Sequence, residues 1–180
     1  MSEPITDEAL MTRYVRENDR AAFKALYKRY VSRLHSFFMR SVGDPDIARD
    51  LVQQTFMHFH RARNDFRLDA PVRPWLYTIA INVRREIHRK RRRKPETQFD
   101  PETHPIPTTT PDVTTASERL VRRSLDALPE AQRTVLLLHW YEGYSYKEIA
   151  EMLGSTPGAV KVRASRAYAK LRVLLQGGEQ

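Results

Sequence analysis

Residues 144–175 read YSYKEIAEMLGSTPGAVKVRASRAYAKLRVLL, and their pattern decides the fold of this part of the chain. Ser145 is a typical helix cap, and Glu148, three residues later, completes the capping-box pattern that begins a helix. Apolar residues then recur at helical spacing as far as Gly154, which suits the left-handed position that ends a helix. These signals predict a short helix with a defined start and a defined end.

A second helix follows after a short turn, with Thr156 as its cap and Pro157 in its first turn, where no backbone N–H is needed. At about 100° per residue, one face is expected to pack on the first helix through Val160, Ala164, Ala167, Tyr168 and Leu171. The opposite half carries Lys161, Val162, Ser165, Arg166, Ala169 and Arg172. The arrangement is the helix-turn-helix motif, whose second helix reads a DNA major groove. A solvated surface helix is the alternative, but both caps, the turn and the basic outer face together favour DNA binding.

The composition of the 180-residue chain favours a nucleic-acid partner. Its net charge of +9 at pH 7 attracts a polyanion, nucleic acid before an anionic membrane. The sequence has no cysteine and therefore no disulfide or thiolate metal site, so we expect a cytoplasmic location. It contains no apolar run long enough to span a bilayer, and residues 1–10 lack the basic start and apolar core of a signal peptide. We therefore expect no stable membrane insertion.

Charge and composition divide the chain into three segments. Residues 1–94 have a net charge of +10, residues 95–115 of −4 and residues 116–180 of +3. The middle segment is rich in proline and threonine and almost free of apolar side chains, so it cannot offset the entropy cost of ordering. The sequence therefore predicts an all-α fold, in which two small helical domains are joined by a flexible acidic linker and the C-terminal domain contains the helix-turn-helix.

Three amphipathic helices are predicted in the N-terminal domain, and no segment alternates with the period of a strand. The first begins after Asn18 or Asp19 and carries the stripe Phe23, Leu26, Tyr27, Tyr30, Leu34, Phe37 and Phe38. The second begins with Asp44 as cap and Pro45 in its first turn, and it buries Ile47, Leu51, Val52, Phe56 and Phe59. The third begins near Pro74 and buries Leu76, Ile79, Ala80, Val83 and Ile87. A shorter helix around Asp7–Arg16 has weaker signals.

The third helix runs into a cationic stretch, Arg84–Lys94, with eight cations among eleven residues. A run of like charge is often only a solvated face, but beside a helix-turn-helix in the same chain it favours nucleic acid. The preceding loop, 65–73, mixes aromatic, polar and cationic side chains that can hold single-stranded DNA. Trp75 and Tyr77 are further stacking candidates, although Trp75 is better explained as a core residue.

Three stretches of the chain occur in the order and spacing of a known family. They are DPDIARDLVQQTFMHFHRAR, FRLDAPVRPWLYTIAINVRREIHRKRRR and ALPEAQRTVLLLHWYEGYSYKEIAEMLGSTPGAVKVRASRAYAKLR. They resemble extracytoplasmic-function sigma factors, the smallest promoter-specificity subunits of bacterial RNA polymerase. The resemblance implies an alternative-type sigma factor that binds core polymerase, recognises promoter DNA and initiates transcription. It also implies that the linker lies near the RNA exit path.

The resemblance implies a role for particular residues. The surface for the polymerase clamp helices corresponds to Asp50, Leu51, Gln53, Gln54, Thr55 and Phe56. Many relatives carry Glu at the position of Gln54 and an aromatic residue such as Trp at that of His60. The surface for the minus-ten strand corresponds to Phe66, Arg67, Arg73, Asn82, Arg85 and Arg89. Within it, Asn82 is implied to hold a flipped base, while Arg85 and Arg89 meet the DNA backbone.

The C-terminal domain and the partners follow from the same resemblance. The reader of the minus-thirty-five element corresponds to Lys161, Val162, Arg163, Ser165 and Arg166. Leu128–Trp140 corresponds to the helix that meets the polymerase flap. An anti-sigma factor, often bound to the inner membrane, is implied as a further partner that covers the DNA-facing and polymerase-facing surfaces. We expect the free protein to be a monomer.

Two other classes of protein fit the sequence less well. A free-standing helix-turn-helix regulator needs a dimerisation helix, and no apolar helix is left over for one. A nuclease or RNA-modifying enzyme needs a metal or catalytic cluster, yet His58 and His60 point about 160° apart around a helix. Asp44, Asp46 and Asp50 lie at a helix start, where carboxylates stabilise the helix dipole. With no phosphate-binding glycine loop or nucleophile motif, we expect no enzyme activity, no cofactor and no metal.

Overall fold

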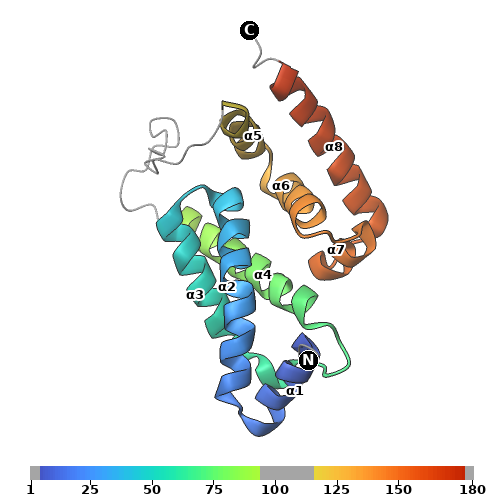
Figure 1. Cartoon of the computed structure of the whole chain (residues 1–180). Helices are drawn as coiled ribbons and strands as arrows, with labels where there is room; N and C mark the ends of the chain where they lie inside the picture. The colour runs from blue at the N-terminus through green and yellow to red at the C-terminus, as the bar shows by residue number, and fades with distance from the viewer. Residues whose placement is uncertain (1–4, 94–115, 177–180) are drawn as a thin grey trace. The chain divides into compact units, whose positions relative to one another are not determined.

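The computed structural model describes residues 5–93 and 116–176, and every element of regular secondary structure within them is helical (Figure 1). This confirms the predicted all-α fold. The predicted linker, 95–115, lies outside the described residues.

The structure divides into two compact units. The first contains the described residues of Met1–Ser36 and Asp46–Phe99. The second contains those of Phe37–Pro45 and Asp100–Gln180. Each unit buries its own set of apolar side chains, as expected for small helical domains.

The two N-terminal helices begin at capped positions. Helix α1 (Asp7–Glu17) follows Thr6, whose side chain accepts a hydrogen bond from the backbone N–H three residues later at 3.2 Å. Helix α2 (Arg20–Val42) follows Asp19, which accepts hydrogen bonds from the next two backbone N–H groups after Arg20 at 2.8 and 3.1 Å. The structure therefore confirms both helices and selects Asp19, rather than its neighbour, as the cap of α2.

Helices α3 (Pro45–Arg61) and α4 (Val72–Arg93) follow, with the 3-10 turn η1 (Arg63–Asp65) between them. Helix α4 begins two residues before Pro74, because proline is tolerated in the first turn of a helix. The predicted inner face of α3 is confirmed at Leu51, Val52, Phe56 and Phe59, which are buried, whereas Ile47 is half-buried.

Helix α4 is buried on more than its predicted side. The predicted stripe is buried at Leu76, Ala80 and Val83. A neighbouring stripe at i, i+4 and i+7, formed by Tyr77, Ile81 and Arg84, is buried as well, and Arg84 is only 4% exposed. Arg84, the first residue of the cationic stretch, is therefore enclosed by the unit and does not present its side chain to solvent. Since both stripes are covered, α4 lies within the core of the first unit.

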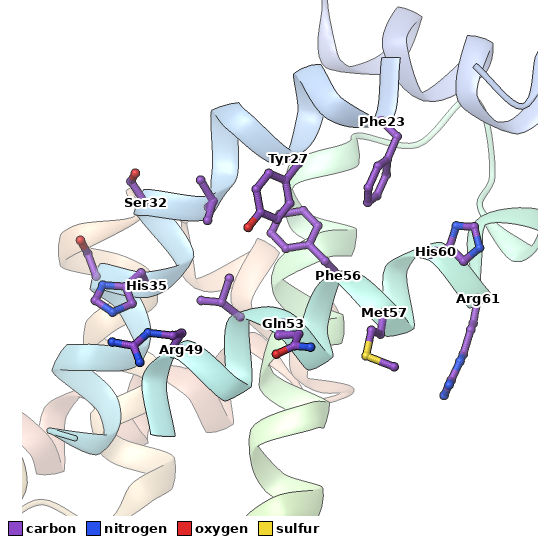
Figure 2. A pocket seen from close by; sticks show the side chains of 13 residues that line it. Phe23, Tyr27, Ser32, His35, Arg49, Gln53, Phe56, Met57, His60 and Arg61 are labelled. Atoms are coloured by element: carbon purple, nitrogen blue, oxygen red, sulfur yellow. The ribbon is translucent and has the colours of Figure 1, made fainter. Parts of the chain in front are cut away.

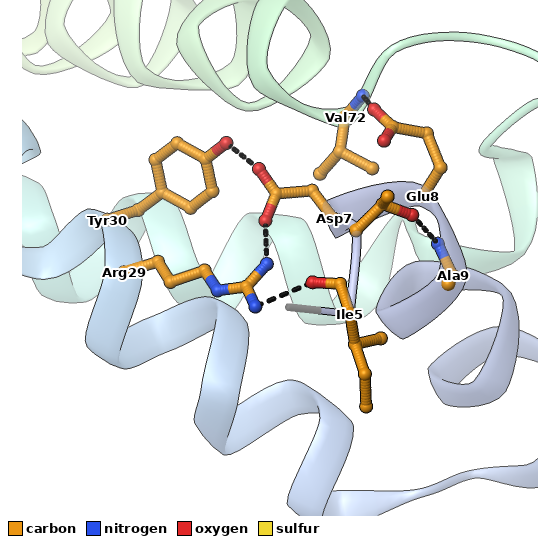
Figure 3. A network of polar contacts seen from close by, with 8 residues as sticks. Ile5, Asp7, Glu8, Ala9, Arg29, Tyr30 and Val72 are labelled. Atoms are coloured by element: carbon orange, nitrogen blue, oxygen red, sulfur yellow. Dashed lines mark hydrogen bonds and ion pairs between the residues drawn. The ribbon is translucent and has the colours of Figure 1, made fainter. Parts of the chain in front are cut away.

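A polar network ties α1 to α2 and α4 (Figure 3). The Asp7 carboxylate accepts a hydrogen bond from Arg29 at 2.6 Å and another from the Tyr30 hydroxyl. The Glu8 carboxylate accepts a hydrogen bond from the backbone N–H of Val72 at 3.2 Å. Two adjacent acidic residues of α1 therefore hold two different helices.

The second unit is built around its last helix. Helices α5 (Ala116–Asp126) and α6 (Glu130–Leu136) and a π-helical turn, η2 (Leu137–Tyr141), precede the pair α7 (Tyr146–Leu153) and α8 (Pro157–Gln176). Helix α8 packs against α5, α6 and α7. The buried side chains of the elements before α8 are mostly aliphatic: Leu125, Leu128, Val135, Leu136, Leu137, Leu138, Ile149, Ala150 and Met152.

Candidate nucleic-acid interface

Helix α7 begins and ends, and helix α8 begins, at the positions that the sequence predicts. The Ser145 N–H donates to Glu148 Oε2 at 2.8 Å, and the Glu148 N–H donates to Ser145 Oγ at 3.3 Å, which completes the capping box. Gly154 ends α7 with φ of +58°, in the left-handed region where a side chain is strained. The Thr156 hydroxyl accepts a hydrogen bond from the Ala159 N–H at 3.2 Å and caps α8. The turn between the helices is therefore fixed at both ends.

The two faces of α8 separate as the helical geometry predicts. Val160, Ala164 and Ala167 are buried against the rest of the unit, whereas Tyr168 and Leu171 are half-buried. Of the residues predicted to read the upstream element, the structure exposes Lys161, Val162, Ser165 and Arg166 and half-buries Arg163. The exposed residues combine cations with short side chains, which supply phosphate and guanine partners without blocking close approach to a duplex.

Phe66, predicted to meet the minus-ten strand, is packed inside the first unit. Its side chain is only 6% exposed, and its ring lies on that of Trp75 with 4.8 Å between centroids. Trp75 is half-buried and also contacts Phe59 at 5.1 Å, so it packs against the core, as the sequence favours. Tyr77 is fully buried and presents no face for stacking. The aromatic side chains of this region therefore pack against the interior of the unit and hold the loop in place.

The exposed surface of the loop is polar. Arg67 and Asp69 form an ion pair at 2.8 Å, and the hydrogen bond from Arg67 holds the pKa of Asp69 below its usual value. Arg73 is half-buried, with its guanidinium 5.8 Å from the centroid of the Tyr77 ring. Arg67 and Arg73, two of the four arginines predicted for the minus-ten surface, thus each have a neighbouring partner within the protein.

The outer face of α4 presents Asn82, Arg85 and Arg89 to solvent. Their spacing of i, i+3 and i+7 places them along one side of the helix. The three exposed residues lie on the same helix as the buried Tyr77 and Arg84, so a helix that is packed into the unit holds them in position. An amide followed by two guanidinium groups can bond a base edge and the phosphates beside it. The described side chains of the cationic run end at Arg89.

An open groove of about 850 Å³ runs between α2 and α3 (Figure 2). Its floor is aromatic, since the rings of Tyr27 and Phe56 lie 4.6 Å apart and those of Phe23 and Phe56 lie 6.3 Å apart. The other lining residues are Val31, Ser32, His35, Ser36, Arg49, Val52, Gln53, Met57, His60 and Arg61. Tyr27 and Met57 remain 39% and 44% exposed, so the groove offers apolar surface rimmed by cations.

The residues predicted for the clamp helices alternate between the surface and the core. Asp50, Gln53 and Gln54 are exposed, whereas the structure buries Leu51, Thr55 and Phe56. The Thr55 hydroxyl donates to the Leu51 carbonyl at 2.7 Å within α3. Gln53 and Phe56 line the groove, and Gln54 does not. The exposed members can contact a partner directly, while the buried ones hold the helix in place.

His60 has a partner that sequence reasoning missed. Its Nδ1 shares a hydrogen bond with the hydroxyl of Tyr14, which lies 46 positions away in α1. Tyr14 is buried, and that burial raises the pKa of its hydroxyl. The pair joins α1 to the end of α3 beside the groove. No local pattern predicts a bond between such distant residues.

An apolar groove of about 400 Å³ also lies within the second unit. Trp140, which is 68% exposed, and Tyr141 line it from the π-helical turn. The other lining residues are Val121, Ser124, Leu125, Leu136, Tyr168, Leu171 and Leu175. The predicted partner segment Leu128–Trp140 contributes only Leu136 and Trp140 to it, so α5, Tyr141 and α8 supply surface that the sequence did not indicate.

Neither a metal cluster nor a membrane span occurs in the part of the chain that the structure describes. No three His, Asp or Glu side chains there come close enough together to hold an ion. None of the helices within residues 5–93 and 116–176 combines the length and hydrophobicity needed to cross a bilayer.

Two family models match the chain. The model described as Sigma-70 region 2 matches residues 26–94, and the model described as Sigma-70, region 4 matches residues 118–171. The first match includes the outer face of α4 and, apart from Phe23, the residues that line the α2–α3 groove. The second includes the helix-turn-helix.

Individual proteins are similar over nearly the whole chain. The ECF RNA polymerase sigma-E factor of Haemophilus influenzae is 32% identical over 93% of this chain and 94% of its own length. The structure of CnrH in complex with the cytosolic domain of CnrY has a TM-score of 0.71 at 29% identity, covering 95% of this chain and 97% of that one. The sigma factor RpoE of Bartonella quintana, in complex with the anti-sigma factor NepR, has a TM-score of 0.68 at 27% identity, covering 86% and 96%.

Proposed function

The chain belongs to the extracytoplasmic-function RNA polymerase sigma factors, and we propose that its two units divide promoter recognition between them. Domain boundaries at 1–94 and 116–180, with a linker at 95–115, suit this division. A member of this family is a transcription initiation factor rather than a classical enzyme. Family membership favours this function over that of a free-standing helix-turn-helix regulator.

The observation that carries the proposal is the basic, exposed face of a capped helix-turn-helix. On α8, Lys161, Val162, Arg163, Ser165 and Arg166 read the minus-thirty-five element in the major groove. Both caps hold the helix at a fixed angle to α7, so its side chains meet the bases without a further ordering cost.

The first unit acts on the minus-ten strand through α4 and the loop before it. Asn82 is exposed and holds an extruded base, while Arg85 and Arg89 contact phosphates along the same face. Extruding a base costs a few kcal/mol, so a pocket that accepts it favours the open promoter. The ion-paired Arg67 and the half-buried Arg73 border this surface.

Core polymerase contacts both units. The clamp helices bind the exposed side chains of α3, Asp50, Gln53 and Gln54, beside the α2–α3 groove. The flap binds the apolar groove at Trp140 in the second unit, whose exposed ring is the kind of anchor that dominates protein interfaces. The polymerase thereby fixes the separation of the two DNA readers.

An anti-sigma factor is the further partner we propose. Relatives occur in complexes with the cytosolic domain of CnrY and with NepR, and such a protein would cover the polymerase-facing grooves described above. We propose that the chain is a cytoplasmic monomer when free and is held at the inner membrane when its anti-sigma factor is membrane-bound.

Run-off transcription tests the function. Purified core polymerase is combined with the chain and a pool of genomic promoter fragments, and we expect defined start sites only when both proteins are present. The free chain should bind duplex DNA weakly and with little sequence preference, with a slope of log K against log salt of about −0.9 per phosphate neutralised. A free-standing regulator gives the opposite result, a preference of the order of a thousandfold without polymerase.

A further inference from the structure

A hollow of about 450 Å³ lies in the first unit, where α1 ends, α2 begins and α3 runs into η1. We call it the His60 hollow, and its lining residues are Tyr14, Asn18, Arg20, Phe23, His60 and Arg63. None of the six belongs to the residues that we assign to promoter DNA or to the clamp helices, although Phe23 and His60 also line the α2–α3 groove. Promoter recognition therefore leaves this hollow unexplained.

The lining of the His60 hollow offers hydrogen-bond donors and no carboxylate. Arg20 and Arg63 carry permanent positive charges, and the amide of Asn18 adds a neutral donor. In the part of the chain that the structure describes, neither arginine forms an ion pair. The carboxylate next to Arg20, that of Asp19, accepts hydrogen bonds from Arg13 at 2.6 Å and from the first turn of α2. Neither guanidinium group of the hollow is therefore neutralised by a carboxylate.

Two of the donors are held in place by neighbouring groups. Arg63 donates from Nη1 to the backbone carbonyl of His60 at 2.8 Å, and its guanidinium lies 6.0 Å from the centroid of the Tyr14 ring. The Tyr14 hydroxyl shares a hydrogen bond with Nδ1 of His60, which leaves Nε2 for a ligand. Nε2 carries a hydrogen when the hydroxyl donates to Nδ1, and also when the imidazole is charged. A ligand thus meets an ordered imidazole beside an ordered guanidinium, which lowers the entropy cost of binding.

The size of the hollow indicates a ligand larger than a bare ion. Its volume lies within the range of about 300–1,000 Å³ that is typical of sites for small molecules. Phe23 is half-buried and contributes its ring to the lining. Guanidinium groups bind phosphate through paired hydrogen bonds, while an apolar or aromatic group attached to that phosphate can contact the ring. The lining therefore matches a phosphate group together with the organic part that carries it.

We propose that the His60 hollow binds a small phosphorylated molecule. Arg20 and Arg63 contact the phosphate oxygens, Nε2 of His60 and the amide of Asn18 donate to them, and Phe23 contacts the organic part. Because its lining residues come from three helices, the bound molecule would strengthen the junction of α1 with α3 beside the α2–α3 groove. This inference goes beyond promoter recognition and does not rest on it.

NMR titration of the full-length chain tests the site, with inorganic phosphate as the first probe. The ¹⁵N-labelled protein is titrated with sodium phosphate while NaCl keeps the ionic strength constant, so that general screening does not change. We expect the backbone amides of Asn18, Arg20 and Arg63 to shift together with one dissociation constant. Amides that do not shift would overturn the proposal.

Arg63→Gln tests whether the charge binds the phosphate. The loss of a hydrogen bond to a charged group predicts an affinity about tenfold weaker or more. Arg16→Gln is the matched control, because it removes the same charge from an exposed position of α1 about 160° around the helix from Tyr14. The control should keep the affinity of the wild type, and equal losses in the two variants would overturn the proposal. Arg20→Gln, at an exposed position, repeats the test if Arg63→Gln does not give the spectrum of a folded protein.

Two further probes identify the class of ligand. Phenyl phosphate should bind about three- to tenfold more tightly than inorganic phosphate, because its ring contacts Phe23. Equal affinities would overturn the contact assigned to Phe23. A short single-stranded oligonucleotide of random sequence should leave the amides of Asn18 and Arg20 unshifted. A shift of these amides at lower concentrations than those needed with phosphate would overturn the small-molecule site in favour of a DNA backbone.

Discussion

The Glu8 carboxylate accepts a hydrogen bond from the backbone N–H of Val72 at 3.2 Å, across 64 positions of sequence. Val72 is the first residue of α4. The first four N–H groups of an α-helix have no hydrogen-bond partner within the helix. A residue of α1 therefore caps α4 and places a negative charge at the positive end of its dipole. The start of α4 borders the loop that we assign to the minus-ten strand.

We expect Glu8→Ala to lower the free energy of unfolding by about 1 kcal/mol, the usual cost of losing a helix cap. Urea denaturation of the full chain measures this. Glu17→Ala, at an exposed position of the same helix, is the control and should cost almost nothing. A loss of equal size in both variants would contradict the capping role.

Asp19 predicts an acid-dependent loss of stability. Hydrogen bonds from the N–H of Ala22, first of all, and of Ala21 lower the pKa of the Asp19 carboxyl below its ordinary value of about 3.9. The Asp19 carboxylate of the unfolded chain therefore takes up a proton at a higher pH than that of the folded chain. It adds to the free energy of unfolding above about pH 3.9, and this contribution is lost as the pH falls through the lowered pKa. Asp19→Asn keeps a capping side chain without the charge. Its deficit in urea denaturation should shrink as pH falls through this range, and a constant deficit would argue against the linkage.

Arg166→Ala should weaken recognition of the upstream promoter element. A guanidinium at a base edge contributes about 1–3 kcal/mol of discrimination, and Arg166 is exposed on the outer face of α8. Run-off transcription from promoters with intact and altered upstream elements measures the effect. Arg166→Lys should restore only part of it, because lysine lacks the planar fork. Full activity and unchanged promoter preference in the alanine variant would refute the assignment.

Asn82→Ala should spare binding to core polymerase and reduce promoter opening. The side chain is exposed on α4, away from the buried Tyr77 and Arg84, so its removal leaves the core intact. Permanganate footprinting reports unpaired thymines in the open complex. Equal thymine reactivity in the variant and the wild type would show that Asn82 holds no base.

Met57→Asp should weaken the complex with core polymerase at least tenfold, because it places a charge over the apolar floor of the α2–α3 groove. Met57 is 44% exposed, so the unit still folds. His58→Asp, next to it on α3 but outside the groove, is the matched control. Competition binding to core polymerase separates the two variants, and similar affinities would place the clamp helices elsewhere.

Helix boundaries and faces were predictable because their causes are local. Asp19, Ser145 and Thr156 cap the helices that follow them within three residues, and the period of apolar residues along α8 indicates which side is covered. The end of α7 was predictable for the same reason, because Gly154 directly follows the last apolar residue of the helix and adopts the left-handed backbone that ends it.

Contacts between distant residues were not predictable in the same way. The bonds of Glu8 to Val72 and of Tyr14 to His60 depend on how helices cross, and a helical period does not say which helix will cover a face. The burial of Arg84 was missed for the same reason, because its cationic neighbours suggest solvent. The grooves in both units were also missed, since each arises between helices rather than along one.

Helix α4 carries Asn82 and Arg85 outside while Tyr77, Ile81 and Arg84 are enclosed on its other sides. On the proposed function, a DNA strand held by the outer residues would be attached to a helix that is packed into the core of the unit. Moving those contacts would require moving that helix, so we expect the base pairs of the promoter to separate before α4 shifts.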